Sequence, residues 1–433
     1  MPHRKWNVDD IEQTRLHLNQ LQQQMEELLG ARKLGRAFFR SVVSGIQQKI
    51  AKVTSNTPAE QMTKSSSDFF AQNPDFKPYN IQLKPPVSRT HCPKILHVIP
   101  YFVTGGSQQL VVDIIEGLSN VYTHEVALLK VHAEQGYVGV TVHDCSGIHT
   151  AEAFTELLQR VGPDLVHVHY YGRWPYSFWK WYHVVFQGAV EYGCPIIENC
   201  NIPYMPYFHP AISRYVYVSE YAQDTYGIRE MPNQVIYPGS NFSFFQRAGT
   251  QPDPDTIGMV YRLDHDKINE RAIEPFIRAV QKRPATKVLI VGGGLYLELY
   301  QQKVAEAGLQ SQFTFTGYVA YEKLAELYRR MAIFVAPVYS ESFGQVTPFA
   351  MNMGIPVVAY NIGALEEMLA NPDVLAEGGD AEALSDIIVD LLNDPARREQ
   401  IGAFNQKRAA ELFTVETMVE EYRKLYETLV PKK

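Results

Sequence analysis

From residue 94 onward, short runs of consecutive apolar residues alternate with amphipathic stretches of helical periodicity. Runs that are apolar on both faces are typical of strands in a buried parallel sheet, because helices cover both sides of such a sheet. Candidate strands span 95–99, 126–129, 165–168, 195–197 and 215–218, and, after a Pro- and Asp-containing break at 248–255, they span 257–260, 288–291, 313–315, 333–336 and 356–359. The pattern predicts an α/β fold of two Rossmann-like, doubly wound domains, with ligands beyond the carboxyl ends of the strands.

The first 90 residues follow a different pattern. Apolar residues from Ile11 to Leu28 fall at heptad a/d positions, and a second amphipathic stretch at 38–50 carries basic residues among apolar ones. Residues 54–93 are rich in Ser, Thr, Pro, Asn and Gln, which is typical of a linker. We expect an α-helical extension with its linker over 1–90. Two roles stay open for it: packing on this protein or on a homodimer partner, and peripheral contact with a membrane.

Length, charge and cysteine content exclude several classes of protein. A chain of 433 residues exceeds the size of one hydrophobic core, so two domains are expected. The formal net charge of −7 argues against a nucleic-acid partner, which requires a basic surface. The 4 cysteines include no CxxC pair, so neither a disulfide framework nor a zinc site is indicated. No run of about 18 apolar residues and no signal-peptide pattern occurs, which favours a cytoplasmic location.

A glycine pair, Gly105 and Gly106, follows the first candidate strand and precedes a predicted helix. Glycine lets a ligand approach the backbone, and the free amides at a helix start attract anions. A tight structural turn explains the pair equally well. The pair does not fit the GxGxxG pattern, and no acidic ribose-binding residue is placed to make it a dinucleotide site.

Two histidines, His167 and His169, lie two positions apart on another candidate strand and therefore share one face. His169 stands at the carboxyl end, where a ligand would bind, whereas His167 is expected to be structural. The alternative for His169 is a hydrogen-bonded core residue. A metal pair is a further alternative, but no acidic or Cys ligand lies at suitable spacing in the chain.

Charged residues follow the first strand of the second domain. Arg262 and Lys267 put a guanidinium and an ammonium at one strand end, which is a plausible clamp for a diphosphate. Asp264 and Asp266 form a DxD-like pair that raises the question of a metal. The competing interpretation of the whole segment is a surface loop of mixed charge.

The segment from Glu341 to Gly344 connects a candidate strand to a helix that ends at Gly354. A carboxylate at this bend can accept hydrogen bonds from sugar hydroxyls. The amino end of the following helix can face a phosphate. This cluster is the most specific in the chain.

The ordered set of these motifs resembles the family-4 glycosyltransferases, which are retaining enzymes of GT-B architecture. The resemblance runs from about Ile95 to the end of the chain and rests on the sequences GG at 105–106, DLVHVHYY at 164–171, VIYPG at 235–239, RLDHDK at 262–267, VGGG at 291–294, ESFG at 341–344, MGIPVVA at 353–359 and FTVETMVEEY at 413–422.

This resemblance implies three parts after the extension: an acceptor domain at 91–247, a nucleotide-sugar donor domain at 248–412, and a helix at 413–433 that crosses back to the first domain. A central cleft would separate the two domains. Arg262, Lys267, Glu341 and His169 would be catalytic. The donor-binding residues would be Gly105, Gly106, Gly239, Arg262, Lys267, Gly292, Glu341, Ser342, Phe343, Gly344 and Glu366. The resemblance further implies no metal and no cofactor, with attack on the front face of the sugar and the donor phosphate as base.

Two positions depart from the family pattern. The second glutamate of the family's paired motif, which grips the nucleotide ribose, is replaced by Phe349, and Ile362 replaces the first glycine of a pair that precedes Glu366. Phenylalanine accepts no hydrogen bond from a hydroxyl, and loss of a charge-assisted bond costs about 1.5–3 kcal/mol of donor binding.

The expected function is transfer of a sugar from a nucleoside-diphosphate sugar to a glycan, lipid-linked or other hydroxyl acceptor, as in the synthesis of surface polysaccharides. Two alternatives are carried: a non-catalytic scaffold that binds sugar nucleotides, and a sugar-nucleotide hydrolase or epimerase of the same fold. The aromatic residues between Tyr170 and Tyr182 suit sugar stacking, although helix packing explains most of them.

Overall fold

The computed structural model describes residues 92–102, 105–131, 139–172, 176–202, 204–246, 252–265 and 267–430. The helical extension predicted at 1–90 and Asp266 lie outside these residues. Both sheets described below belong to the same folded unit. None of the described helices is both long and apolar enough to cross a bilayer.

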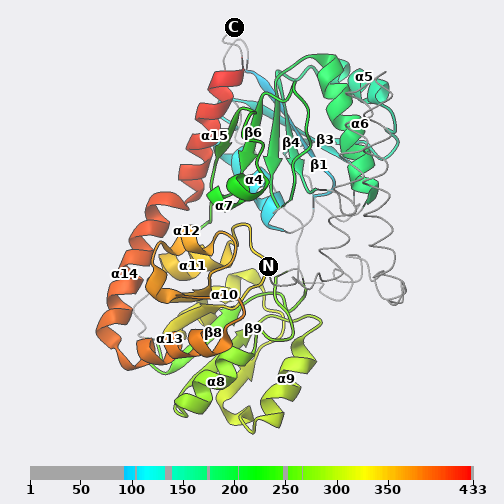
Figure 1. Cartoon of the computed structure of the whole chain (residues 1–433). Helices are drawn as coiled ribbons and strands as arrows, with labels where there is room; N and C mark the ends of the chain where they lie inside the picture. The colour runs from blue at the N-terminus through cyan, green and yellow to red at the C-terminus, as the bar shows by residue number, and fades with distance from the viewer. Residues whose placement is uncertain are drawn as a thin grey trace, which may run out of the picture. The chain divides into compact units, whose positions relative to one another are not determined.

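The first sheet has seven parallel strands in the order β3-β2-β1-β4-β5-β6-β7 (Figure 1). Its strands are β1 (Lys94–Ile99), β2 (Thr123–Leu128), β3 (Thr141–Asp144), β4 (Leu165–Tyr170), β5 (Ile196–Cys200), β6 (Arg214–Tyr217) and β7 (Asn233–Val235). Its helices are α4 (Gly106–Leu118), α5 (Ala151–Val161), α6 (Tyr176–Tyr192) and α7 (Glu220–Tyr226).

The second sheet has six parallel strands in the order β10-β9-β8-β11-β12-β13. Its strands are β8 (Thr256–Val260), β9 (Lys287–Val291), β10 (Phe313–Phe315), β11 (Ile333–Ala336), β12 (Val357–Tyr360) and β13 (Leu375–Ala376). Its helices are α8 (Glu274–Lys282), α9 (Leu297–Glu306), α10 (Tyr321–Tyr328), α11 (Val346–Asn352), α12 (Leu365–Leu369), α13 (Ala381–Asn393) and α14 (Pro395–Leu412). The prediction of two doubly wound parallel sheets is therefore confirmed.

Local sequence signals set the helix boundaries. At the start of α5, the Thr150 hydroxyl accepts a hydrogen bond from the Ala153 amide, and Gly162 ends the helix at φ +64°. A hydroxyl N-cap and a left-handed glycine are the residues that satisfy the free amides and carbonyls of helix ends. In each sheet the strand order reverses beside the first strand, between β1 and β4 and between β8 and β11. Ligands of doubly wound sheets bind at the carboxyl side of this position.

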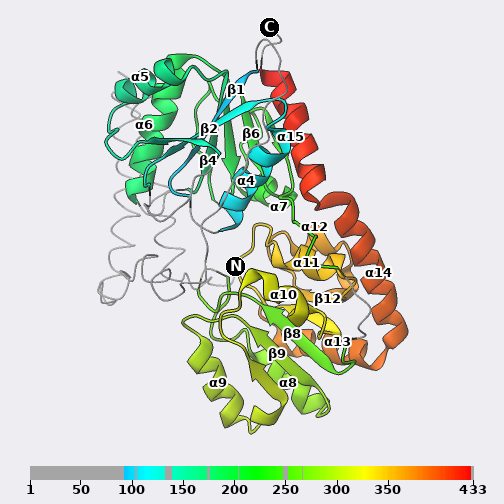
Figure 2. The ribbon, with the colours of Figure 1, turned by 180° about the vertical axis from the view of Figure 1, so that it is seen from behind.

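After α14 the chain returns to the first sheet as α15 (Val415–Leu429), which lies beside α4 in both views (Figures 1 and 2). Tyr422 and Tyr426 pack in one apolar cluster with Ile95 of β1 and Ile114 of α4. Gly117 permits this contact, since a Cβ there would lie 2.6 Å from Val419 Cγ1. The sequence placed this returning helix at 413–433, of which 431–433 lie outside the described residues.

Four histidines, His97, His124, His167 and His169, are buried inside the first sheet. Burial is the largest cause that lowers the pKa of each, and it brings those of His124 and His167 to about 3. All four rings are therefore neutral at pH 7. The core of this domain carries a group of side chains that resist protonation.

We expect acid to destabilise this domain. Because the pKa values are lower in the folded state, the unfolded chain binds more protons below its own histidine pKa of about 6.5. The free energy of unfolding should be greatest above about pH 6.5 and fall as the pH drops towards 3, by up to about 1.4 kcal/mol per pH unit for each histidine. Urea unfolding at several pH values measures this dependence. In the His124→Gln variant, the slope of the free energy of unfolding against pH should decrease by the equivalent of about one proton. An unchanged slope would contradict the account.

Candidate functional site

The predicted site residues of the second domain gather at one edge of its sheet. The loops after β8, β9, β11 and β12 carry Arg262 and Lys267, the glycines 292–294, Glu341 and Glu366. All these strands are parallel, so their carboxyl ends meet at the same edge. The fold thus brings together side chains that lie up to about a hundred residues apart in the chain.

An ion pair between Lys267 and Glu341 lies at the centre of this edge. Lys267 Nζ donates to Glu341 Oε1 at 2.6 Å, and the side chains are 30% and 2% exposed. The Phe343 amide donates to the same Oε1 at 3.3 Å. The Tyr339 amide donates to the Lys267 carbonyl at 2.9 Å, which joins the two loops through their backbones as well.

The second carboxylate oxygen of Glu341, Oε2, is buried and accepts no hydrogen bond. A buried charged oxygen without a donor is costly, so native proteins rarely leave one unless a ligand completes it. Hydroxyl groups are suitable donors for such an acceptor. The carboxylate is thus held by a cation on one oxygen and open to a ligand donor on the other.

Two glycines with positive φ hold Glu341 in place. Gly344 has φ +76°, and a Cβ there would lie 2.3 Å from Glu341 Oε2. Gly363 has φ +62°, and its Cβ would lie 1.8 Å from the Glu341 carbonyl oxygen. Any side chain at either position would displace Glu341. Gly363 is the second position of the pair whose first glycine is replaced by Ile362, and its contact with Glu341 could not be predicted from sequence spacing.

The glycine loop after β9 is fixed by the DxD-like segment. The Leu295 amide donates to Asp264 Oδ1 at 2.9 Å, and the Leu263 amide donates to the Gly293 carbonyl at 2.9 Å. Gly292 has φ +128°, and a Cβ there would lie 1.9 Å from the Tyr261 carbonyl oxygen. Asp264 therefore orients the glycine loop through its side chain.

The loops of the first sheet approach this edge at two points. Gln345, directly after the ESFG motif, donates from Nε2 to the Gly239 carbonyl at 3.1 Å. A Cβ on Gly106 would lie 3.7 Å from Gln345 Oε1. Burial raises the pKa of Tyr101, and the positive charge of the exposed Arg262 partly lowers that pKa again. The two side chains therefore lie close enough to interact electrostatically. Gln345 is the contact that sequence reasoning missed, and its only signal is its place after Gly344.

The structure places the other residues that were predicted to bind the sugar donor in different surroundings. Phe343 is 3% exposed and packs against Tyr237 and Phe413, with ring centroids at 5.8 and 5.3 Å. Ser342 is also buried, and Gly105 precedes the first turn of α4. Glu366 is exposed on the first turn of α12.

Gly239 and His169 lie in packed surroundings. A Cβ on Gly239 would lie 2.5 Å from Val415 Cα, so the glycine lets the chain returning from α14 pass. His169 is fully buried, and its Nε2 lies 3.1 Å from His97 Nδ1. A ring with no exposed surface offers no contact to a sugar in this arrangement, so we leave His169 out of the site.

The position of the missing second glutamate lies inside an aromatic cluster. Phe349 is 5% exposed, and its ring stacks on Phe245 at a centroid distance of 3.9 Å and an angle of 11°. Tyr321 and Phe242 meet the same ring edge-on at 6.0 and 6.3 Å. Asn352 Nδ2 donates to the Phe245 carbonyl at 2.8 Å. Phe349 thus fixes the segment that leads from the first sheet to the second.

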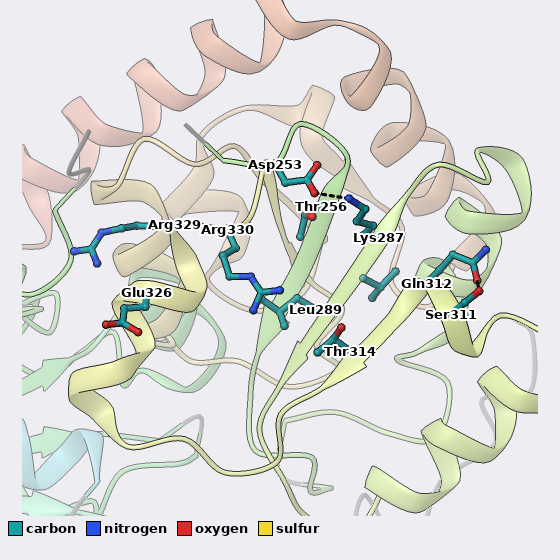
Figure 3. A pocket seen from close by; sticks show the side chains of 11 residues that line it. Asp253, Thr256, Lys287, Leu289, Ser311, Gln312, Thr314, Glu326, Arg329 and Arg330 are labelled. Carbon is teal, nitrogen blue, oxygen red and sulfur yellow. Dashed lines mark hydrogen bonds and ion pairs between the residues drawn. The ribbon is translucent and has the colours of Figure 1, made fainter. Parts of the chain in front are cut away.

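A separate groove of about 510 Å³ lies at the amino ends of β8 and β9, the opposite edge of the second sheet (Figure 3). Lys287 and Asp253 form an ion pair of 2.7 Å across its rim. Arg329 donates to the carbonyls of Phe244 and Gln246 at 3.5 and 3.3 Å. None of the predicted site residues lines this groove, and three of its charged residues, Lys287, Asp253 and Arg329, make contacts within the fold.

Comparisons with known proteins identify relatives of the second half of the chain. Residues 241–408 match the family model of the glycosyl transferases group 1, and this range contains all the loops around Glu341. The chain is 26% identical over 220 residues to the lipopolysaccharide core biosynthesis mannosyltransferase LpsB of Rhizobium meliloti (strain 1021), covering 46% of this chain and 62% of that protein. It is 30% identical over 196 residues to a D-inositol 3-phosphate glycosyltransferase of Mycolicibacterium smegmatis (strain ATCC 700084 / mc(2)155), covering 43% and 44%. The chain thus spans less than two thirds of the length of these relatives.

Solved structures share the fold over most of the chain. The Anabaena protein Alr3699/HepE, solved in complex with UDP, superposes with a TM-score of 0.64 at 20% identity and covers 78% of this chain and 100% of that one. A glycosyltransferase from Rickettsia africae ESF-5 gives a TM-score of 0.65 at 17% identity and covers 79% and 100%. The fold is GT-B.

The aromatic surroundings of Phe349 lead to a stability prediction. Phe349→Ala should lower the free energy of unfolding by about 3–5 kcal/mol through cavity formation. Phe349→Glu, which introduces the glutamate that the sequence resemblance implies at this position, should destabilise at least as much because it buries a carboxylate without a partner. Urea unfolding measures both. Phe404→Ala, at a position that is 44% exposed, serves as the control with little expected change. A Phe349→Glu variant as stable as wild type would show that this position can face a ligand.

Proposed function

We propose that the protein is a glycosyltransferase that moves a sugar from a nucleoside-diphosphate sugar to a hydroxyl acceptor. The observation that carries the proposal is Glu341, whose carboxylate is fixed by Lys267 on one oxygen and lacks a donor on the other. The family match over 241–408 supports it, because that range holds this carboxylate and the loops around it. The Anabaena neighbour was solved with UDP-glucose as well as with UDP, which favours a nucleotide-sugar donor.

Each loop has a role in this reaction. Lys267 and Arg262 bind the donor diphosphate and neutralise the charge that grows on the departing nucleoside diphosphate. The sugar hydroxyls donate to Glu341 Oε2. The Phe343 amide holds Glu341 Oε1, and the Gly344 amide, ahead of α11, faces the phosphates. Cationic side chains supply the charge stabilisation, so we propose a reaction that needs neither a metal nor a cofactor.

We further propose that the transfer retains the anomeric configuration. The acceptor hydroxyl attacks the anomeric carbon from the side on which the nucleotide leaves. The bond between that carbon and the β-phosphate oxygen breaks, the new carbon–oxygen bond forms, and the hydroxyl proton passes to a phosphate oxygen. This route requires no protein nucleophile. Proton NMR of the product's anomeric centre tests it, and an inverted product would refute it.

The acceptor is a glycan, a lipid-linked sugar or another hydroxyl compound. Similar proteins are named for lipopolysaccharide core and capsular polysaccharide synthesis, which favours a surface polysaccharide as product. An electrostatic interaction links Arg262, on a loop of the second sheet, with Tyr101, on a loop of the first sheet. We propose that the acceptor binds on the first-sheet side of this contact.

A non-catalytic scaffold that binds sugar nucleotides is the second candidate. Phe349 favours it, because the position of the family's ribose-binding carboxylate is occupied by a packed aromatic ring. Titration calorimetry with a panel of nucleoside diphosphates, paired with a turnover assay, separates the two. Binding without turnover on any acceptor would favour the scaffold, whereas turnover establishes the enzyme.

Removing the cations should abolish transfer. Arg262→Ala and Lys267→Ala should each lower the transfer rate about 10²–10³-fold, the cost of removing one stabilising donor from a developing anion. Arg262→Ala is the cleaner variant because Lys267→Ala also leaves the buried Glu341 carboxylate unpaired. Lys287→Ala is the matched control, since that lysine is 62% exposed at the opposite edge of the sheet. Unchanged rates in both site variants would remove the diphosphate clamp from the account.

A further inference from the structure

Three strands of the first sheet bring histidines onto one buried face. His97 comes from β1, His124 from β2, and His167 and His169 from β4. His97 and His167 are directly paired across the parallel ladder. Sequence spacing offered only His167 and His169 as neighbours, because the third ring comes from a strand about 70 residues earlier.

Three of these rings bring ring nitrogen atoms close to one another. One ring nitrogen each from His97, His167 and His169 lies within 4.8 Å of the others. His97 Nδ1 and His169 Nε2 are 3.1 Å apart. Two imidazole nitrogens that bind one tetrahedral zinc at about 2.0–2.1 Å lie roughly 3.3 Å apart, so the observed separation accepts an ion with little movement.

Two of the three rings are oriented by partners on their far side. His97 Nε2 lies 3.0 Å from His124 Nδ1, and His167 Nδ1 lies 2.8 Å from the Tyr426 hydroxyl of α15. Metal-bound histidines almost always have such a partner on the other ring nitrogen, since it fixes the tautomer and the ring plane. Because His97 Nε2 and His167 Nδ1 are engaged in these contacts, His97 Nδ1 and His167 Nε2 are the nitrogens that could bind an ion between the rings.

The inward side of the cluster is not satisfied by the protein. His167 Nε2 is buried and has no hydrogen-bond partner, although Asn199 lies close enough to raise the ring's pKa against the effect of burial. On the other side of the His169 ring, away from His97, Nδ1 is also buried without a partner. Buried polar atoms of this kind call for a ligand, a water or an ion.

We propose that His97, His167 and His169 form a binding site for a divalent transition-metal ion of the zinc type. Three imidazoles suit Zn²⁺, Co²⁺, Ni²⁺ or Cu²⁺ and do not suit Mg²⁺ or Ca²⁺, which take oxygen ligands.

The site has a structural role and is separate from the sugar-transfer loops. Among the residues that the structure describes, no Asp, Glu or Cys joins the three histidines. The ion therefore keeps a fourth position for water or hydroxide, and its affinity is lower than that of a thiolate site. The ion would hold β1 to β4 and, through His167 and Tyr426, would also hold α15. This inference stands without the proposed function, because metal binding is measured independently of transfer.

Metal titration of the full-length, chelator-treated protein tests the site. Co²⁺ should bind with a stoichiometry of one and give the visible absorption of a low-symmetry cobalt centre, and one equivalent of Zn²⁺ should displace it and raise the melting temperature. His97→Gln, His167→Gln and His169→Gln should each lose the signal. His124→Gln, which removes only the outer partner, should bind about 10–100-fold more weakly. His183→Gln, on α6, is the control and should bind like wild type.

X-ray absorption at the zinc edge is measured on the wild-type protein, so it tests the site even if one of the variants does not fold. The wild-type spectrum should contain the scattering of about three imidazole ligands, the ligand number that the geometry assigns. Absence of stoichiometric binding, or a zinc environment of oxygen atoms alone, would overturn the proposal. The cluster would then be a ladder of neutral histidines joined by hydrogen bonds.

Discussion

The ion pair between Lys267 and Glu341 is the interaction on which the site depends. A carboxylate that is 2% exposed requires a cation, and Lys267 supplies it from the loop after a different strand. This geometry exists only because β8 and β11 are adjacent parallel strands with their carboxyl ends at one edge. Gly344 and Gly363 remove the atoms that would displace the carboxylate. The sheet topology, two glycines and one lysine thus converge on a single charged group.

A second constraint joins the two sheets. The aromatic stack of Phe349 on Phe245 and the hydrogen bond from Gln345 to Gly239 both start in the segment from 341 to 352. The same short segment therefore carries the carboxylate of the site and the contacts to the chain that enters from the first sheet. Because of this double role, we expect Phe349→Glu to lower the stability of the fold.

Much of this could be predicted from the sequence. Apolar runs such as 95–99 and 257–260 are long enough to cover both faces of a strand, so they identify buried parallel sheets and place Arg262 and Glu341 at strand ends. Tertiary contacts could not be predicted in this way. His169 stands at a strand end like the others, yet its ring lies inside the core because His97 and His124 line the same face. The sequence resemblance placed Gly239 at the ligand, but the absence of a side chain there makes room for the backbone of Val415, which lies far away in the chain.

Hydrogen–deuterium exchange of the full chain, with and without a saturating nucleoside diphosphate, tests the central claim most directly. The claim is that the edge of the second sheet around Lys267 and Glu341 binds the donor. The account predicts slower exchange of the backbone amides around Lys267, in the glycine loop 292–294 and from 341 to 347. It predicts no change around Lys287 and Arg329, at the opposite edge. Protection confined to that opposite edge, or none at 341–347, would contradict the account.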